Sequence, residues 1–148
     1  MDLHLNTLFV NNQDNALLFY TEMLGFVMKS DTQADDPPGV RWLTVAAPDD
    51  PTGVELFLEL SRTPAAKALQ RRLFMEGIPS AVFIVEDVWK AYDEMRDRGV
   101  IFYTQPVRSE WGTDVVCDDG CGNLIELHQH PVRPARAPES RPAPQASV

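Results

Sequence analysis

Two short segments near the end of the chain hold the residues best suited to chemistry. The first segment contains Cys117 and Cys121, the two cysteines of the chain. They are too few for a disulfide framework, and their C-x3-C spacing differs from that of a zinc knuckle. We therefore expect structural cysteines at a strand end or turn, with a redox pair as the alternative.

Glu126 and His128 form the second segment. They lie two residues apart in an expected strand, so their side chains point to the same face. The ordinary pKa of an imidazole suits a general base or a pocket ligand. The alternative is a hydrogen-bonded or solvent-facing histidine with no such role.

Composition and charge narrow the classes of partner. The 148 residues suit one compact domain or two fused small modules, and the net charge is -9. Residues 1–130 hold ten basic and twenty-one acidic residues, which disfavours nucleic acid and anionic membrane surfaces and is compatible with a cationic ligand. The chain lacks both an apolar run of about 20 residues and the basic start of a signal peptide, so we expect a cytoplasmic protein.

The order of elements repeats along the chain. An apolar strand ends at Val10 and is followed by an amphipathic helix over 15–24 that Gly25 stops. A second apolar strand over 81–85 is followed by a helix over 88–98 that Gly99 stops. Further strands are predicted over 25–29, 40–47, 53–60, 100–103, 113–117 and 123–129. Two near-equal units with the same element order indicate a duplicated module.

These elements predict an α+β fold of two βαβββ modules. The first module spans 1–60, a linker helix 61–78 and the second module 79–130. Residues 131–148 contain five prolines and few large apolar side chains, so we expect a Pro-rich flexible tail.

Several local motifs resemble one known family. They are Phe19-Tyr20-x3-Leu24-Gly25-Phe26, Glu86-Asp87, Arg98-Gly99-Val100 and Gly120-x-Gly122-Asn123-x-Ile125-Glu126-Leu127. In order and spacing over residues 3–129 they resemble the vicinal oxygen chelate superfamily, which includes glyoxalases, bleomycin resistance proteins and extradiol dioxygenases. The resemblance is greatest to uncharacterised glyoxalase-like members. It implies that each module curls its sheet into an incomplete barrel around a cavity, with the helices outside.

The resemblance also implies where a metal would bind. Metal-using members carry one ligand on the first and one on the last strand of each module. The last-strand positions fall on Glu59, or Glu55 in another register, and on Glu126. The first-strand positions fall on Leu5 and Ser80, which do not supply the usual imidazoles. We therefore expect no complete metal site and no cofactor, with a residual divalent metal on Glu59 and Glu126 as the alternative.

From this resemblance we expect a cavity that binds a small molecule. Strand alternation places the following residues around it: Leu5, Thr7, Phe9, Phe57, Glu59, Ser80, Val82, Ile84, Glu126 and His128. Alternation directs His4 to the opposite face. Trp42 and Trp111 are expected at the mouth, where they stack on a ligand or pack at a rim or dimer interface. Glu59 and Glu126 have the alternative of being solvated strand residues.

The expected function is binding of a small cationic or aromatic molecule by a homodimer without a complete metal site. This follows the bleomycin resistance template, which conflicts least with Leu5 and Ser80. One alternative is a metal-dependent glyoxalase-type lyase or isomerase, or a related dioxygenase-like enzyme, that uses Glu59 and Glu126, with Glu126 as the catalytic group. The other is a structural or regulatory dimer without a ligand.

Overall fold

Two four-stranded sheets with the same strand order form the protein. The computed structural model describes residues 1–132, so residues 133–148 of the predicted tail lie outside the described part. The first sheet has the order β1-β4-β3-β2 and the second β5-β8-β7-β6. The strands are β1 (Leu5–Val10), β2 (Val27–Gln33), β3 (Arg41–Ala46), β4 (Glu55–Leu60), β5 (Ala81–Ile84), β6 (Val107–Ser109), β7 (Gly112–Asp118) and β8 (Leu124–Gln129).

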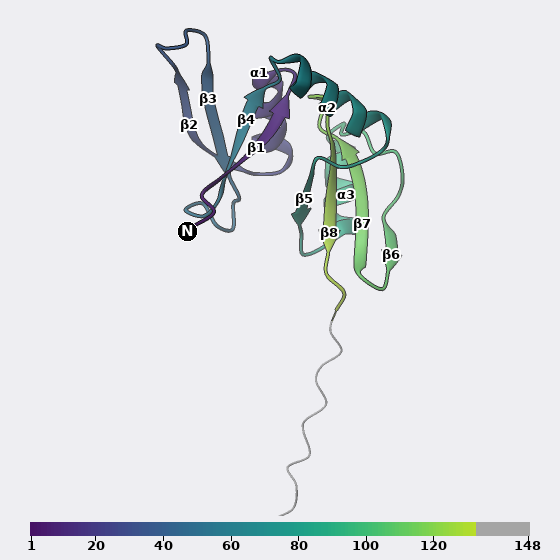
Figure 1. The fold of residues 1–148 in the computed structure, drawn as a ribbon. Helices are drawn as coiled ribbons and strands as arrows, with labels where there is room; N and C mark the ends of the chain where they lie inside the picture. The colour runs from purple at the N-terminus through teal and green to yellow at the C-terminus, as the bar shows by residue number, and fades with distance from the viewer. Residues whose placement is uncertain (133–148) are drawn as a thin grey trace, which may run out of the picture.

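The two sheets stand side by side in Figure 1, and each keeps two free edge strands, so neither closes into a barrel. The first strand of each module pairs in parallel with the last, and the other pairs are antiparallel. The predicted α+β fold of two βαβββ modules is therefore confirmed.

Side-chain caps set where the helices begin. Helix α1 (Gln13–Leu18) follows Asn12, whose side chain accepts a hydrogen bond from the Asn15 amide, and it continues as the π-helical turn η1 (Phe19–Met23). This cap starts the helix two residues earlier than its apolar pattern predicts. Helix α3 (Val88–Asp97) is capped by Asp87 in the same way. Helix α2 (Pro64–Met75) begins after the cap Thr63 and runs from the end of the first sheet across the top of the second (Figure 1).

One hydrophobic core unites the two modules. Alternate residues of the inner strands, including Leu58 and Leu127, pack with the buried faces of α1, η1 and α3. Tyr20 of η1 lies edge to face with Phe83 of β5, with ring centroids 6.3 Å apart, so an aromatic contact joins the modules. Among residues 1–132, no helix covers the opposite face of either sheet, which we call the open face (Figure 1).

A buried polar cluster forms a second joint between the modules. The Asp119 carboxylate, in the turn between β7 and β8, accepts hydrogen bonds from the Tyr20 hydroxyl (2.8 Å) and the Asn123 side-chain amide (2.8 Å). The backbone amides of Cys121 and Asn123 also donate to it. The Asn123 amide reaches across to the Phe9 carbonyl of β1 at 2.8 Å. These bonds offset the cost of burying the carboxylate.

Two features of the chain differ from the prediction. Residues 100–103 form no strand and contribute one bridge between Phe102 and Cys117, whereas the short exposed β6 lies further along. Strand β2 runs on to Gln33. Both missed segments are polar, exposed edge strands, which lack the apolar alternation by which a strand is recognised.

The cysteines are structural in this fold. Both are fully buried and unpaired, and burial raises the pKa of each thiol to about 12. A thiol with such a pKa stays protonated and unreactive at neutral pH, which disfavours the redox alternative. Among residues 1–132, no helix reaches the length and hydropathy needed to cross a membrane.

Replacing Asn123 tests the polar joint. We expect Asn123→Ala to lower the free energy of unfolding by about 2–3 kcal/mol, because it leaves the buried Asp119 carboxylate and the Phe9 carbonyl short of a donor. Urea denaturation followed by circular dichroism measures this. The control Asn6→Ala, at an exposed position of the edge strand β1, changes it by less than about 0.5 kcal/mol. Equal losses in both variants would contradict a special role for the joint.

Candidate functional site

Three side chains that can bind a cation meet on the open face of the second sheet. Asp114 of β7 and Glu126 and His128 of β8 each offer a ligand atom, and these atoms lie within 4.8 Å of one another. We call these three residues the acid–histidine cluster. All three are partly buried.

The β7–β8 hairpin sets the positions of this cluster. Its register places Asp114 opposite His128 and Val116 opposite Glu126, so the three polar side chains share one face. Gly112 begins β7 with φ 139°, and a Cβ there would lie 2.1 Å from the Gln129 carbonyl oxygen and 2.8 Å from the His128 ring. Only glycine permits this close approach beside the imidazole. The Gln129 side chain accepts a hydrogen bond from the Val88 amide and so ties the end of β8 to α3.

Contacts within the cluster set its electrostatics. The Nδ1 atom of His128 is in hydrogen-bond contact with an oxygen of Asp114, which fixes the orientation of the ring and leaves Nε2 as its other polar atom. The pKa of Glu126 is raised by partial burial first and then by the nearby Asp114 carboxylate, while His128 opposes the shift. A bound cation would relieve the repulsion between the two acids.

Apolar side chains surround the cluster. Val82 and Ile84 of β5 pair in register with Glu126 and His128 and are 54% and 58% exposed. Val107 of β6 pairs with Asp114 and is also exposed. Trp111, in the turn between β6 and β7, is 75% exposed. The second sheet thus combines charged groups with an uncovered apolar surface.

The open face of the first sheet is more aromatic and less charged at its centre. Leu5, Thr7 and Phe9 pair in register with Glu55, Phe57 and Glu59, so these six residues share the face. The Trp42 ring lies over Phe57, with centroids 4.4 Å apart. The Thr44 hydroxyl donates to Glu55 at 3.0 Å. Glu59 therefore lies on this sheet and outside the acid–histidine cluster.

Two of the four ligand positions that the resemblance implies, Leu5 and Ser80, hold residues that are not usual metal ligands. Leu5 offers no donor atom, and the Ser80 hydroxyl is engaged with Asn123 at 3.3 Å. His4 lies just before β1, with its Nε2 atom 3.5 Å from a carboxylate oxygen of Glu55, which is the register partner of Leu5. Within residues 1–132, the acid–histidine cluster is the group of three side chains close enough together to hold a metal, and it shares Glu126 with the expected pair.

Asp114 was not predicted from the sequence, because the alternation of residues in its own strand does not distinguish it. The register of the hairpin could have revealed it, because counting outward from the turn at 118–123 pairs Asp114 with His128. Pairing an acid with a histidine across two strands needs this register as well as the pattern of each strand.

Comparison with known proteins places the chain in a family. The model of the Glyoxalase/Bleomycin resistance protein/Dioxygenase superfamily matches residues 3–127. The uncharacterized protein YurT of Bacillus subtilis (strain 168) is 45% identical over 130 residues, which are 87% of this chain and 99% of YurT.

Two solved structures have the same fold. The crystal structure of UcmS2 has a TM-score of 0.73 and 32% identity, and the match covers 86% of this chain and 97% of UcmS2. TnmS3, an antibiotic binding protein from Streptomyces sp. CB03234, has a TM-score of 0.69 and 24% identity, with 88% of this chain and 97% of TnmS3 covered. The chain therefore belongs to the glyoxalase/bleomycin resistance protein/dioxygenase superfamily.

Proposed function

We propose that the protein binds a small aromatic or aliphatic cation on the open face of its second sheet. The observation that carries this proposal is the acid–histidine cluster, in which two carboxylates and an imidazole meet beside exposed aliphatic side chains. A ligand with a protonated amine and an apolar body matches both features.

Charge and fold support the same class of ligand. The net charge of -9 attracts cations at long range. TnmS3 shows that this fold is used by an antibiotic binding protein, although at 24% identity the likeness concerns the fold alone.

A divalent metal is the second candidate occupant of the cluster. Two carboxylate oxygens and one imidazole nitrogen suit zinc, manganese or iron(II), and three protein ligands leave positions open for water or substrate. Such an ion would supply Lewis-acid chemistry of the kind that a lyase or isomerase needs. In either case the contact with Asp114 orients the His128 ring.

We also propose that two copies of the chain associate through their open faces. Trp42, Val82, Ile84 and Val107 are between 40% and 60% exposed on these faces. Large apolar side chains gathered on one face mark an interaction surface in many proteins. A second copy would cover them and enclose the cluster, which is open to solvent in one chain.

Ligand binding is tested with 9-aminoacridine, a flat aromatic amine that is protonated at neutral pH, and with its uncharged relative acridone. We expect 9-aminoacridine to bind saturably in isothermal titration calorimetry and acridone to bind far more weakly. Glu126→Gln should weaken the binding about tenfold or more, because it removes one of the two carboxylates that face the amine. Glu94→Gln, which removes an exposed acid of α3, should leave it unchanged.

The affinity should also depend on pH. Because the pKa of Glu126 is raised above its usual 4.5, its carboxyl must lose a proton before it attracts a cation. Affinity should therefore rise as the pH increases through this raised pKa and be lost as the pH falls below it. Equal affinity for 9-aminoacridine and the uncharged acridone would refute the proposal that the site binds a cation.

The metal candidate is tested by calorimetric titration of nickel, zinc, manganese and iron(II) into the protein. If the cluster holds a metal, we expect stoichiometric binding that Asp114→Asn abolishes and that Glu59→Gln leaves intact, because Glu59 lies on the other sheet. Loss of binding in Glu59→Gln would instead favour the ligand positions implied by the family resemblance. No binding to the wild-type protein at millimolar metal would retire this candidate.

Association is tested by size-exclusion chromatography with light scattering. We expect the mass of a dimer for the wild-type protein and a shift toward the monomer for Ile84→Lys, which places a charge on the apolar surface of the second sheet. Leu69→Lys, on the exposed side of α2, is the matched control and should remain dimeric. A wild-type monomer at all concentrations would exclude this proposal.

A further inference from the structure

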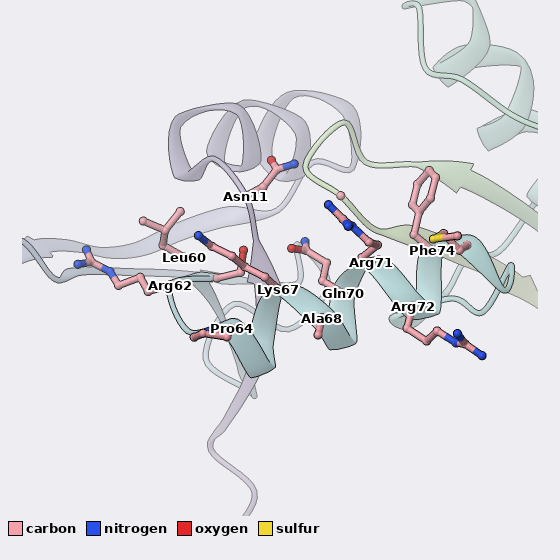
Figure 2. A pocket seen from close by; sticks show the side chains of 13 residues that line it. Asn11, Leu60, Arg62, Pro64, Lys67, Ala68, Gln70, Arg71, Arg72 and Phe74 are labelled. Atoms are coloured by element: carbon pink, nitrogen blue, oxygen red, sulfur yellow. The ribbon is translucent and has the colours of Figure 1, made fainter.

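A groove of about 1100 Å³ lies along α2, on the part of the molecule that joins the two modules. Its walls come from α2, from the segment just before it, and from Asn11 and Gly122 of the two modules. Figure 2 shows Lys67, Gln70 and Arg71 on the side of α2 that faces Leu60 and Asn11, whereas Arg72 points away on the other side of the helix. Three polar side chains of α2 therefore line the same groove.

Cations are concentrated in this groove. Residues 60–75 contain Arg62, Lys67, Arg71 and Arg72 and no acidic residue, although the chain as a whole has a net charge of -9. Arg72 pairs with Glu76 at 2.8 Å, and Arg62 donates to the Gly39 carbonyl. Within residues 1–132, Lys67 and Arg71 make no ion pair. Two cations thus line the groove without an acidic partner from the described part of the chain.

The floor of the groove is rigid and polar. Gln70 is buried, and its side-chain amide donates to the carbonyls of Phe9 (3.0 Å) and Cys121 (2.9 Å). Gly122 makes room for it, because a Cβ at that position would lie 2.7 Å from the Gln70 amide nitrogen. A side chain fixed in this way holds its helix neighbour Arg71 beside the turn of the second module.

Apolar surface completes the groove. Leu60, Phe74 and Met75 line it together with the methylene groups of the basic side chains. A space of this size, with apolar walls and two unpaired cations, matches a drug-sized molecule that carries one anionic group. Nucleic acid fits less well, because the acidic remainder of the chain would repel a long polyanion.

We propose that this groove is a second binding site, which takes a small organic oxyanion and is separate from the acid–histidine cluster. Lys67 and Arg71 bind the anionic group, and Leu60, Phe74 and Met75 contact the apolar body. Phosphates, sulfonates and carboxylates share this chemistry. The proposal concerns a different surface from the proposed cation site and stands whether or not that site binds its ligand.

Isothermal titration calorimetry with three related probes tests the groove. Phenyl phosphate and benzoate carry an oxyanion on an aromatic ring, and phenol is their uncharged counterpart. We expect saturable binding of at least one oxyanion, no measurable binding of phenol, and weaker binding as salt is added. The double variant Lys67→Gln/Arg71→Gln should weaken oxyanion binding about tenfold or more, because both charge-assisted contacts are lost.

A matched variant separates the groove from the effect of net charge. Lys29→Gln/Lys90→Gln removes two exposed cations elsewhere and changes the net charge by the same amount. It should retain wild-type affinity, and circular dichroism should show both double variants folded, because all four residues are exposed. Equal losses in the two variants, retained affinity in Lys67→Gln/Arg71→Gln, or no oxyanion binding by the wild-type protein up to millimolar concentrations would each overturn the proposal.

Discussion

The burial of one carboxylate, Asp119, is the constraint on which the rest of the structure depends. Burial raises its pKa, and the hydrogen bonds from Asn123, Cys121 and Tyr20 act in the opposite direction. A carboxylate in the core is costly unless its oxygens are satisfied, so the surrounding chain must keep its donors in place. Burial and the same carboxylate raise the pKa of Tyr20, so its hydroxyl remains protonated and available as a donor at neutral pH. The Asp119 carboxylate therefore takes part both in the turn of the second module and in the contact between the two modules.

The buried Asp119 carboxylate affects the geometry of the proposed cation site through the β7–β8 hairpin. The Asp119 carboxylate accepts hydrogen bonds from the backbone amides of Cys121 and Asn123. These bonds stabilise the turn and therefore the register in which the residues of the two strands face each other. A slip of one residue would send Glu126 and His128 into the core and bring Leu127 out to the solvent. The cluster is therefore specified by polar groups at the far end of the hairpin as well as by its own contacts. A buried ionic group that fixes register in this way can be retained at a cost in stability.

Much of the fold can be predicted from the sequence because the two modules follow strong local rules. The caps Thr63 and Asp87 and the glycines that end the helices mark element boundaries, and the apolar alternation of β4 and β8 marks their faces. The edge strand β6 escapes prediction because its exposed residues bury no apolar surface. Glu126 and His128 can be paired from one strand, but Asp114 joins them only through cross-strand register. The role of Gln70 is harder still to predict, because the residues to which it donates hydrogen bonds, Phe9 and Cys121, are 61 and 51 residues away in the sequence.

The distribution of charge gives the small protein two surfaces of opposite character. The acid–histidine cluster lies on the open face of the second sheet, and the groove of Lys67 and Arg71 lies beside the turn at the start of β8. The β7–β8 hairpin connects the two places, because Gly122 lies against Gln70 at one end and Gly112 lies against His128 at the other. The conformation of this hairpin, which the hydrogen bonds to the buried Asp119 carboxylate constrain, is therefore a physical route by which binding at one surface can affect the other.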